Sequence, residues 1–238
     1  MQTEVIQTGE IWRKRGISSA VLKNIAVVTM LIDHIGAVIV IRLLIQKGLY
    51  GAMVDQEAYI AWVGQNRGMY GTYMAMRIIG RLAFPIYCFL LAEGFQKTHN
   101  VKKYLGRMLL FALISEIPFD RALSGRLWDT EYQNVFFTLF IGLMVIAGLR
   151  LVDQRLAGTE TWRKLAGVGL YAVIIVAGSV LALVLKTDYS FKGILAITVL
   201  YLFRSRRKAQ VWAGVIVFLL MDGLEMIAAL SFLLIWFY

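Results

Sequence analysis

Long apolar runs separated by short polar stretches organise this chain of 238 residues. A helix needs roughly 20 mostly apolar residues to cross the hydrocarbon of a bilayer. On this criterion the pattern predicts helices over residues 25–45, 78–95, 104–119, 135–149, 165–185 and 191–203. The last stretch, 211–238, is apolar except for Asp222 and Glu225. It predicts either two short helices broken at Asp222 and Gly223 or one long bent helix.

The connections between these runs complete the predicted architecture. Residues 46–76 mix glycines, charges and tyrosines, which predicts a long non-cytoplasmic loop with an amphipathic piece. Pro85 lies inside the second run and removes a backbone hydrogen bond, which predicts either a kink or a neighbouring group that satisfies the freed carbonyl. We therefore predict an all-α, polytopic integral membrane bundle of about seven to eight transmembrane helices. A single transmembrane domain over 25–238 would follow a basic cytoplasmic segment, 1–24.

Composition supports a membrane protein, and charge gives it an orientation. Apolar residues make up 59% of the chain and charged residues only 17%, so lipid must cover surface that a soluble domain could not hide. The net charge of +10 could indicate a nucleic-acid partner. However, the basic residues gather in clusters between the runs, as the positive-inside rule predicts for cytoplasmic loops. We expect lipid contact, no nucleic acid, a cytoplasmic N-terminus and no cleavable signal peptide.

Asp33 and His34 lie near the middle of the first predicted helix, where charged groups are rare and usually face a protein interior or a wet cavity. One interpretation is structural: Asp33 pairs with an arginine, and a backbone carbonyl satisfies His34. The other is catalytic, with a neutral His34 imidazole as the general base. Neighbouring helical residues point about 100° apart, so Asp33 is not expected to orient His34 directly.

The next run offers candidates for binding an anion. Arg77 and Arg81 share one helix face at i and i+4. They either pair structurally, Arg81 with Asp33 while Arg77 reaches the interface, or clamp a substrate carboxylate or a cofactor phosphate. Glu93 and Lys97 lie near the opposite end of this run, where a basic cluster marks the cytoplasm and could attract a polyanionic cofactor.

Four further polar residues stand at predicted helix ends: Glu116, Asn134, Asp188 and Tyr189. Polar residues there are ordinarily caps, and we keep these four as additional site candidates. Two histidines and one cysteine make a zinc site improbable, and the usual nucleotide-binding and hydrolase motifs are absent from the sequence. We predict no metal.

These residues also resemble a known family, the TraX family. The resemblance lies in Leu22–Ala26 running into Met30–Gly36, in Arg77–Pro85 through Ala92–Phe95, in Ser115–Phe119, in Asn134–Thr138, and in Asp188 and Tyr189 through Tyr201–Arg204. The segments occur in order and cover most of residues 20–205. The family is named for a conjugation-system membrane protein that N-acetylates pilin, and its Asp-His helix is similar to that of a wider group of membrane acyltransferases.

The resemblance implies an activity, a co-substrate and a place in the cell. It implies acetyl-CoA as the acyl donor and His34 as the base or the transient acyl carrier. Asp33, Arg77, Arg81, Glu93 and Lys97 would shape the site and the cofactor path. It further implies the bacterial inner membrane, and a C-terminal helix with a Tyr-Pro-x-His element that does not follow Tyr238 here. The acceptor stays open between a pilin-like N-terminus and a glycan.

Three hypotheses follow from the sequence. The first is a membrane acyltransferase moving an acetyl group from acetyl-CoA to an amine or hydroxyl. The second is a proton-coupled transporter in which Asp33 and His34 relay protons. The third is a non-catalytic assembly factor for a surface appendage. A second copy of the chain, forming a homodimer, is a further candidate partner.

Overall fold

The computed structural model describes residues 16–156, 158 and 160–238, and within these ranges the chain is all-α. No β-strand occurs in the described residues, where one isolated bridge joins Gln133 to Thr187. The predicted fold class is confirmed. Most of the basic segment predicted over 1–24 lies outside the described residues, and the first helix begins at Ser19, with the Ser18 hydroxyl accepting from the Val21 amide.

Twelve α-helices and two irregular helical segments follow one another in the described part of the chain. They are α1 (Ser19–Ile35), the π-helical η1 (Gly36–Val40), α2 (Ile41–Gln46), α3 (Leu49–Ala52), α4 (Gln56–Gln65), α5 (Arg67–Gly80), α6 (Ala83–Lys97), α7 (Val101–Leu123), α8 (Val135–Arg155), α9 (Thr161–Val184), α10 (Ser190–Leu202), α11 (Arg207–Leu219), the 3₁₀-helical η2 (Gly223–Leu230) and α12 (Ser231–Trp236).

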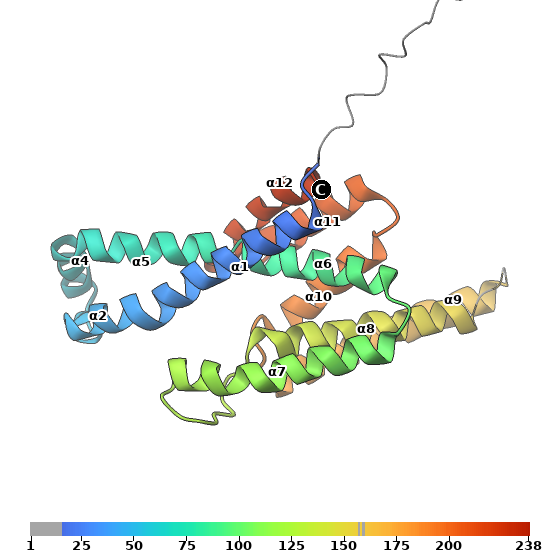
Figure 1. Ribbon diagram of the computed structural model, residues 1–238, viewed down its shortest axis with the longest axis horizontal. Helices are drawn as coiled ribbons and strands as arrows, with labels where there is room; N and C mark the ends of the chain where they lie inside the picture. Colours follow the sequence, from blue (N-terminus) through green and yellow to red (C-terminus); the bar gives the residue numbers. More distant parts are fainter. Residues whose placement is uncertain (1–15, 157, 159) are drawn as a thin grey trace, which may run out of the picture.

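The helices pack around a shared apolar core. The α1–η1–α2 rod lies beside the α5–α6 rod, and α8 contacts α7, α9 and α10 (Figure 1). Helix α10 also packs on α6 and α11, which joins the two groups of helices. The largest buried side chains include Phe89, Phe95 and Tyr201, where these groups meet.

In the part of the chain that the structure describes, four helices are long and apolar enough to cross a membrane: Ser19–Gln46, Arg67–Lys97, Val135–Arg155 and Thr161–Val184. Exposed valines and leucines cover α9, and a bilayer removes such surface from water. The chain is therefore a membrane protein. The number of seven to eight spans stays a prediction.

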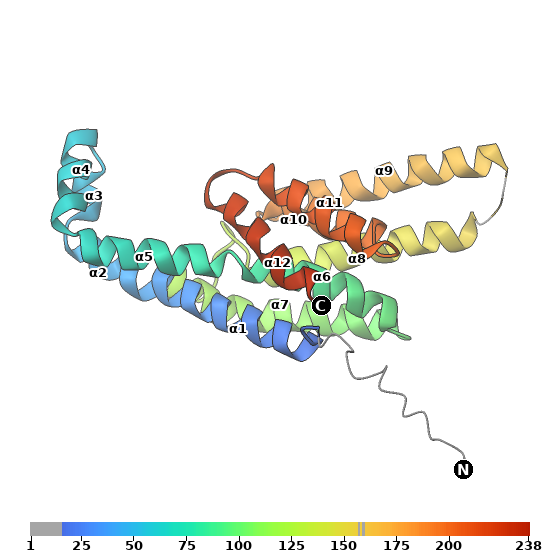
Figure 2. The same ribbon diagram turned by 90° about the horizontal axis from the view of Figure 1, so that it is seen from above.

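The predicted long loop over 46–76 is wrong, because most of it is helical. Helices α3 and α4 fold back before α5 begins at Arg67, and the two rods project from the bundle as a helical head (Figure 2). This head has a small core of its own around Leu44, Leu49, Ala52 and Trp62. Tyrosines that indicated a loop make aromatic contacts here, because the Tyr70 ring packs against the rings of Tyr59, Trp62 and Tyr73.

The predicted irregularities occur, with clear causes. The α5–α6 rod breaks at Arg81 and Leu82. Pro85 lies four residues after Arg81 and has no N–H to offer that carbonyl, so the helical ladder is interrupted there. At the C-terminus the chain breaks after α11, and Gly223 takes a φ of +61°. This confirms the broken form of the last stretch.

The buried thiol of Cys88 gives a simple test of this packing. Its side chain is fully buried in α6 against the main core. We expect no maleimide labelling of Cys88 in native protein in mild detergent, and complete labelling after denaturation. As a control, Val54→Cys places a thiol in the head at a position that is 87% exposed, and this cysteine should react at once. Rapid labelling of native wild type would contradict the packing of α6.

Candidate functional site

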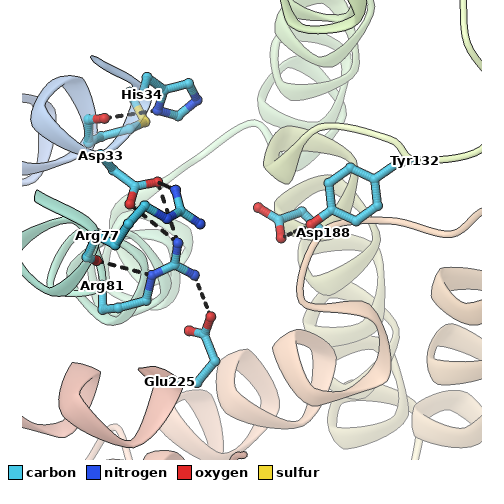
Figure 3. A network of polar contacts seen from close by, with 8 residues as sticks. Asp33, His34, Arg77, Arg81, Tyr132, Asp188 and Glu225 are labelled. Carbon is cyan, nitrogen blue, oxygen red and sulfur yellow. Dashed lines mark hydrogen bonds and ion pairs between the residues drawn. The ribbon is translucent and has the colours of Figure 1, made fainter. Parts of the chain in front are cut away.

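A cavity of about 260 Å³ lies between α1, α5 and α6 on one side and the end of α7 and the turns before α8 and α10 on the other, and several charged residues of the bundle lie in its walls. Its lining includes Asp33, His34, Arg77, Arg81, Tyr132, Asp188 and Tyr189. Residues far apart in the sequence thus converge on one chamber (Figure 3). This arrangement meets the requirement that charged groups at membrane depth face a protein-lined cavity.

Asp33 is held by two arginines. The Arg77 Nη1 lies 2.7 Å from Asp33 Oδ2, and the Arg81 Nη2 lies 3.3 Å from Asp33 Oδ1. Arg81 also pairs with Glu225 of η2 through its other terminal nitrogen. The two guanidinium and two carboxylate charges cancel, which lowers the free-energy penalty of burying each group. The predicted Asp33–Arg81 pair is present, whereas Arg77 also binds Asp33 and does not extend to an interface.

Local backbone features explain how the cluster forms. Arg77 and Arg81 are one helical turn apart, so both side chains reach the same carboxylate. Gly80 lies between them, directly against Asp33, and a β-carbon at this position would overlap the Asp33 side chain. Only glycine lets α5 approach α1 this closely. After His34, η1 adopts a π-helical turn, a feature that often marks functional sites.

His34 is oriented by the backbone. Its Nδ1 lies 2.8 Å from the Met30 carbonyl oxygen. The carbonyl only accepts, so Nδ1 carries the proton in the neutral ring, and Nε2 is left with a lone pair. Between the described residues no hydrogen bond joins His34 to Asp33, as the 100° offset predicted. The site therefore presents an imidazole whose free nitrogen can accept a proton.

The loops before α8 and α10 form the wall of the cavity that faces Asp33 and the two arginines. The Tyr132 hydroxyl donates to Asp188, which also accepts from the Tyr189 amide. Burial raises the pKa of the Asp188 carboxyl, while the Tyr132 hydroxyl and Arg81 act in the opposite direction. The Tyr189 ring stacks on Phe84 with 3.6 Å between centroids.

The backbone of the turn between α9 and α10, which contributes Asp188 and Tyr189 to this wall, is strained. Lys186, Tyr189 and Ser190 all have positive φ, which is unfavourable for side chains larger than glycine. Such backbone persists only where the surrounding packing holds it. Tyr189 is therefore fixed against the cavity.

The other predicted site residues lie outside the cavity lining. Asn134 caps α8 by accepting from the Phe136 amide, so its predicted capping role is confirmed. Its side chain also contacts the buried Glu116, and its backbone amide lies 3.2 Å from Glu116 Oε2. This pair holds α7 against α8 next to the cavity. Glu93 and Lys97 form an i,i+4 pair with 2.8 Å between Oε1 and Nζ at the far end of α6, so the structure does not group them with Arg77 and Arg81.

Sequence reasoning did not include Tyr132, Gly80 and Glu225 among the site residues. Glu225 could have been found, because it is one of two charges in an apolar stretch and the argument used for Asp33 applies to it equally. Tyr132 and Gly80 carry no such signal, since their roles depend on which helices meet. Within the ranges described, no three or more His, Cys, Asp or Glu side chains gather as a metal-ligand set.

Fold and site together define a helical membrane protein with a charge-neutral ion cluster beside an intramembrane histidine. The chain belongs to the TraX family: the family profile described as "TraX protein" matches residues 18–236.

One curated relative gives a shorter match. The chain is 40% identical over 81 residues to the "Probable fimbrial assembly protein FimC, serogroup H1" of Dichelobacter nodosus. That match covers 31% of this chain and 33% of the relative, so it spans about a third of the relative's length. No solved structure matches the chain.

Removing the central carboxylate should destabilise the bundle. Asp33→Ala leaves Arg77 without its carboxylate partner and Arg81 with only Glu225, and a broken buried pair typically costs about 3–5 kcal/mol. We expect a clear drop in the thermal unfolding midpoint in detergent. Glu57→Ala, on the exposed first turn of α4, removes a carboxylate that has no such role and should leave the midpoint nearly unchanged. Equal midpoints for the two variants would show that the cluster does not stabilise the fold.

Proposed function

We propose that this protein is a membrane acyltransferase that moves an acetyl group from acetyl-CoA to an amine or hydroxyl acceptor. The main support for this proposal is the geometry of His34. Its Nδ1 is bonded to the Met30 carbonyl, its Nε2 stays free among the described residues, and the residue lines a cavity that also contains charged groups. A fixed tautomer with one accepting nitrogen is what a general base near neutral pH requires. Membership of the TraX family and the resemblance to membrane acyltransferases support this choice.

The transfer would proceed with His34 as the base. The acceptor nitrogen or oxygen attacks the thioester carbonyl carbon and gives its proton to Nε2. The new C–N or C–O bond forms, the C–S bond breaks, and the leaving thiolate recovers a proton from the imidazolium. Charge builds transiently on the carbonyl oxygen, and the N–H groups of Arg77 and Arg81, held in place by their carboxylate partners, would donate hydrogen bonds to it in the same chamber.

The carboxylates that pair with the arginines determine the net charge of the cavity before this step. Asp33 and Glu225 neutralise the two arginines in the resting cavity. Fixed, paired charges need little rearrangement when an oxyanion forms, which is the advantage of a preorganised site. Asp33 thus acts as a positioning residue for Arg77 and Arg81.

The acceptor and location belong to the same proposal. The name of the Dichelobacter nodosus relative, a probable fimbrial assembly protein, supports a pilin-like subunit as the acceptor over a glycan. Basic clusters after α6, α8 and α10 support a bacterial inner-membrane protein with a cytoplasmic N-terminus. The cavity then lies toward the opposite side, where an exported subunit is available.

A non-catalytic assembly factor is the second candidate, and the name of the same relative favours it. Such a factor would bind its appendage subunit without consuming acetyl-CoA. Co-purification of that subunit would survive alanine at His34 if no chemistry were involved.

Substitution of the two histidines separates these functions. His34→Ala should fold and lower acetyl transfer from radiolabelled acetyl-CoA to a pilin-derived peptide by about 10²-fold or more, the scale of general-base catalysis. His99→Ala removes the other histidine of the chain, an exposed residue after α6, and should retain full activity. Undiminished turnover by His34→Ala would remove this residue from the mechanism.

A further inference from the structure

A second polar recess lies at the turn between α6 and α7. It is open to the outside, has a volume of about 340 Å³ and is lined by Gly94 and Lys97 of α6, by Asn100, and by Lys103, Tyr104 and Arg107 of α7. The Tyr104 hydroxyl approaches Gly94 so closely that a β-carbon there would lie 3.3 Å from it. The hairpin is therefore tightly closed at its tip, and the cations line the recess beside it.

The recess carries surplus positive charge. Lys97 is neutralised by Glu93. Lys103 and Arg107 share one face at i and i+4, and no carboxylate pairs with either among the residues that the structure describes. The first turn of α7 adds the positive end of a 23-residue helix dipole.

The other arginine-lined cavities are better neutralised. Arg77 and Arg81 are occupied by Asp33 and Glu225, which leaves little net charge for an anionic ligand. A pocket between α6, α8 and α10 contains Arg150 and Arg204, but Asp153 lies within it. The α6–α7 recess is thus the better place for a group with several negative charges.

The recess and the site cavity lie at opposite ends of α6 and α7. Phe119 and Leu123 at the end of α7 line the cavity, while Tyr104 and Arg107 near its start line the recess. Twelve residues separate Arg107 from Phe119, which corresponds to about 18 Å of helix. One ligand that reaches both places must be long, anionic at one end and reactive at the other.

We propose that this recess binds the phosphate groups of the acyl donor, with the thioester arm extending along α6 and α7 toward His34. This inference rests on the proposed acyltransferase function and assigns the cofactor phosphates to Lys103 and Arg107. The same phosphate chemistry is present in anionic lipid headgroups, and the experiment separates the two sources.

The test uses full-length protein in nanodiscs of neutral phosphatidylcholine, titrated calorimetrically with CoA. The K103Q/R107Q double variant should bind CoA about tenfold or more weakly, which corresponds to about 1.4 kcal/mol or more. Its KM for acetyl-CoA should rise with kcat nearly unchanged. K102Q is the matched control, because Lys102 has the same charge on the same helical turn and is exposed outside the recess lining. R107K keeps the charge and should largely retain binding.

The possible negative results distinguish the acyltransferase proposal from the assignment of the recess. If wild type binds no CoA at all, the acyltransferase proposal itself fails. If wild type and H34A bind CoA but K103Q/R107Q binds it equally well with an unchanged melting temperature, the recess assignment alone is overturned. Nanodiscs containing phosphatidylglycerol test the lipid source: stabilisation by this lipid that the double variant loses, with CoA affinity intact, would assign the recess to a headgroup.

Discussion

The pairing of Asp33 with Arg77 and Arg81 is the constraint on which the site depends. Burying any one of these charges alone would be costly, and the cluster becomes tolerable because two cations and two anions, including Glu225, come together. This requirement brings α1, α5 and η2 to one point. It also fixes the level in the bundle at which His34 faces the cavity. The residues that hold these helices together are therefore the same residues that line the site.

The apolar pattern predicted the architecture well where helices are long and uniform. The α8 and α9 helices lie close to their predicted ranges, because a run of apolar residues of membrane length has few alternatives. The loop predicted for residues 46–76 is wrong for a physical reason. Their helices are stabilised by packing in the head, around Trp62 and its tyrosine neighbours, and not by apolar length.

The site was predictable in part. The high free-energy cost of a charge at membrane depth identified Asp33, and helix geometry correctly separated it from His34. The contribution of Tyr132 and the wall formed by Tyr189 depend on how loops before α8 and α10 approach α6. Such long-range contacts leave no local pattern. Glu93 and Lys97 were grouped with the arginines because they share one run, yet about 18 Å of helix separates Arg81 from Glu93.

The two irregularities in the long rods fall at nearly the same level. The π-turn η1 begins two residues after His34, and the α5–α6 break occurs at Arg81. Helices bend most easily where their hydrogen-bond ladder is interrupted. The head beyond these points has its own core around Trp62, so any bending of the head relative to the bundle would be concentrated at these two irregularities. A force applied to the tip of the head would therefore first displace the imidazole of His34 and the guanidinium groups of Arg77 and Arg81, which lie at the base of the head.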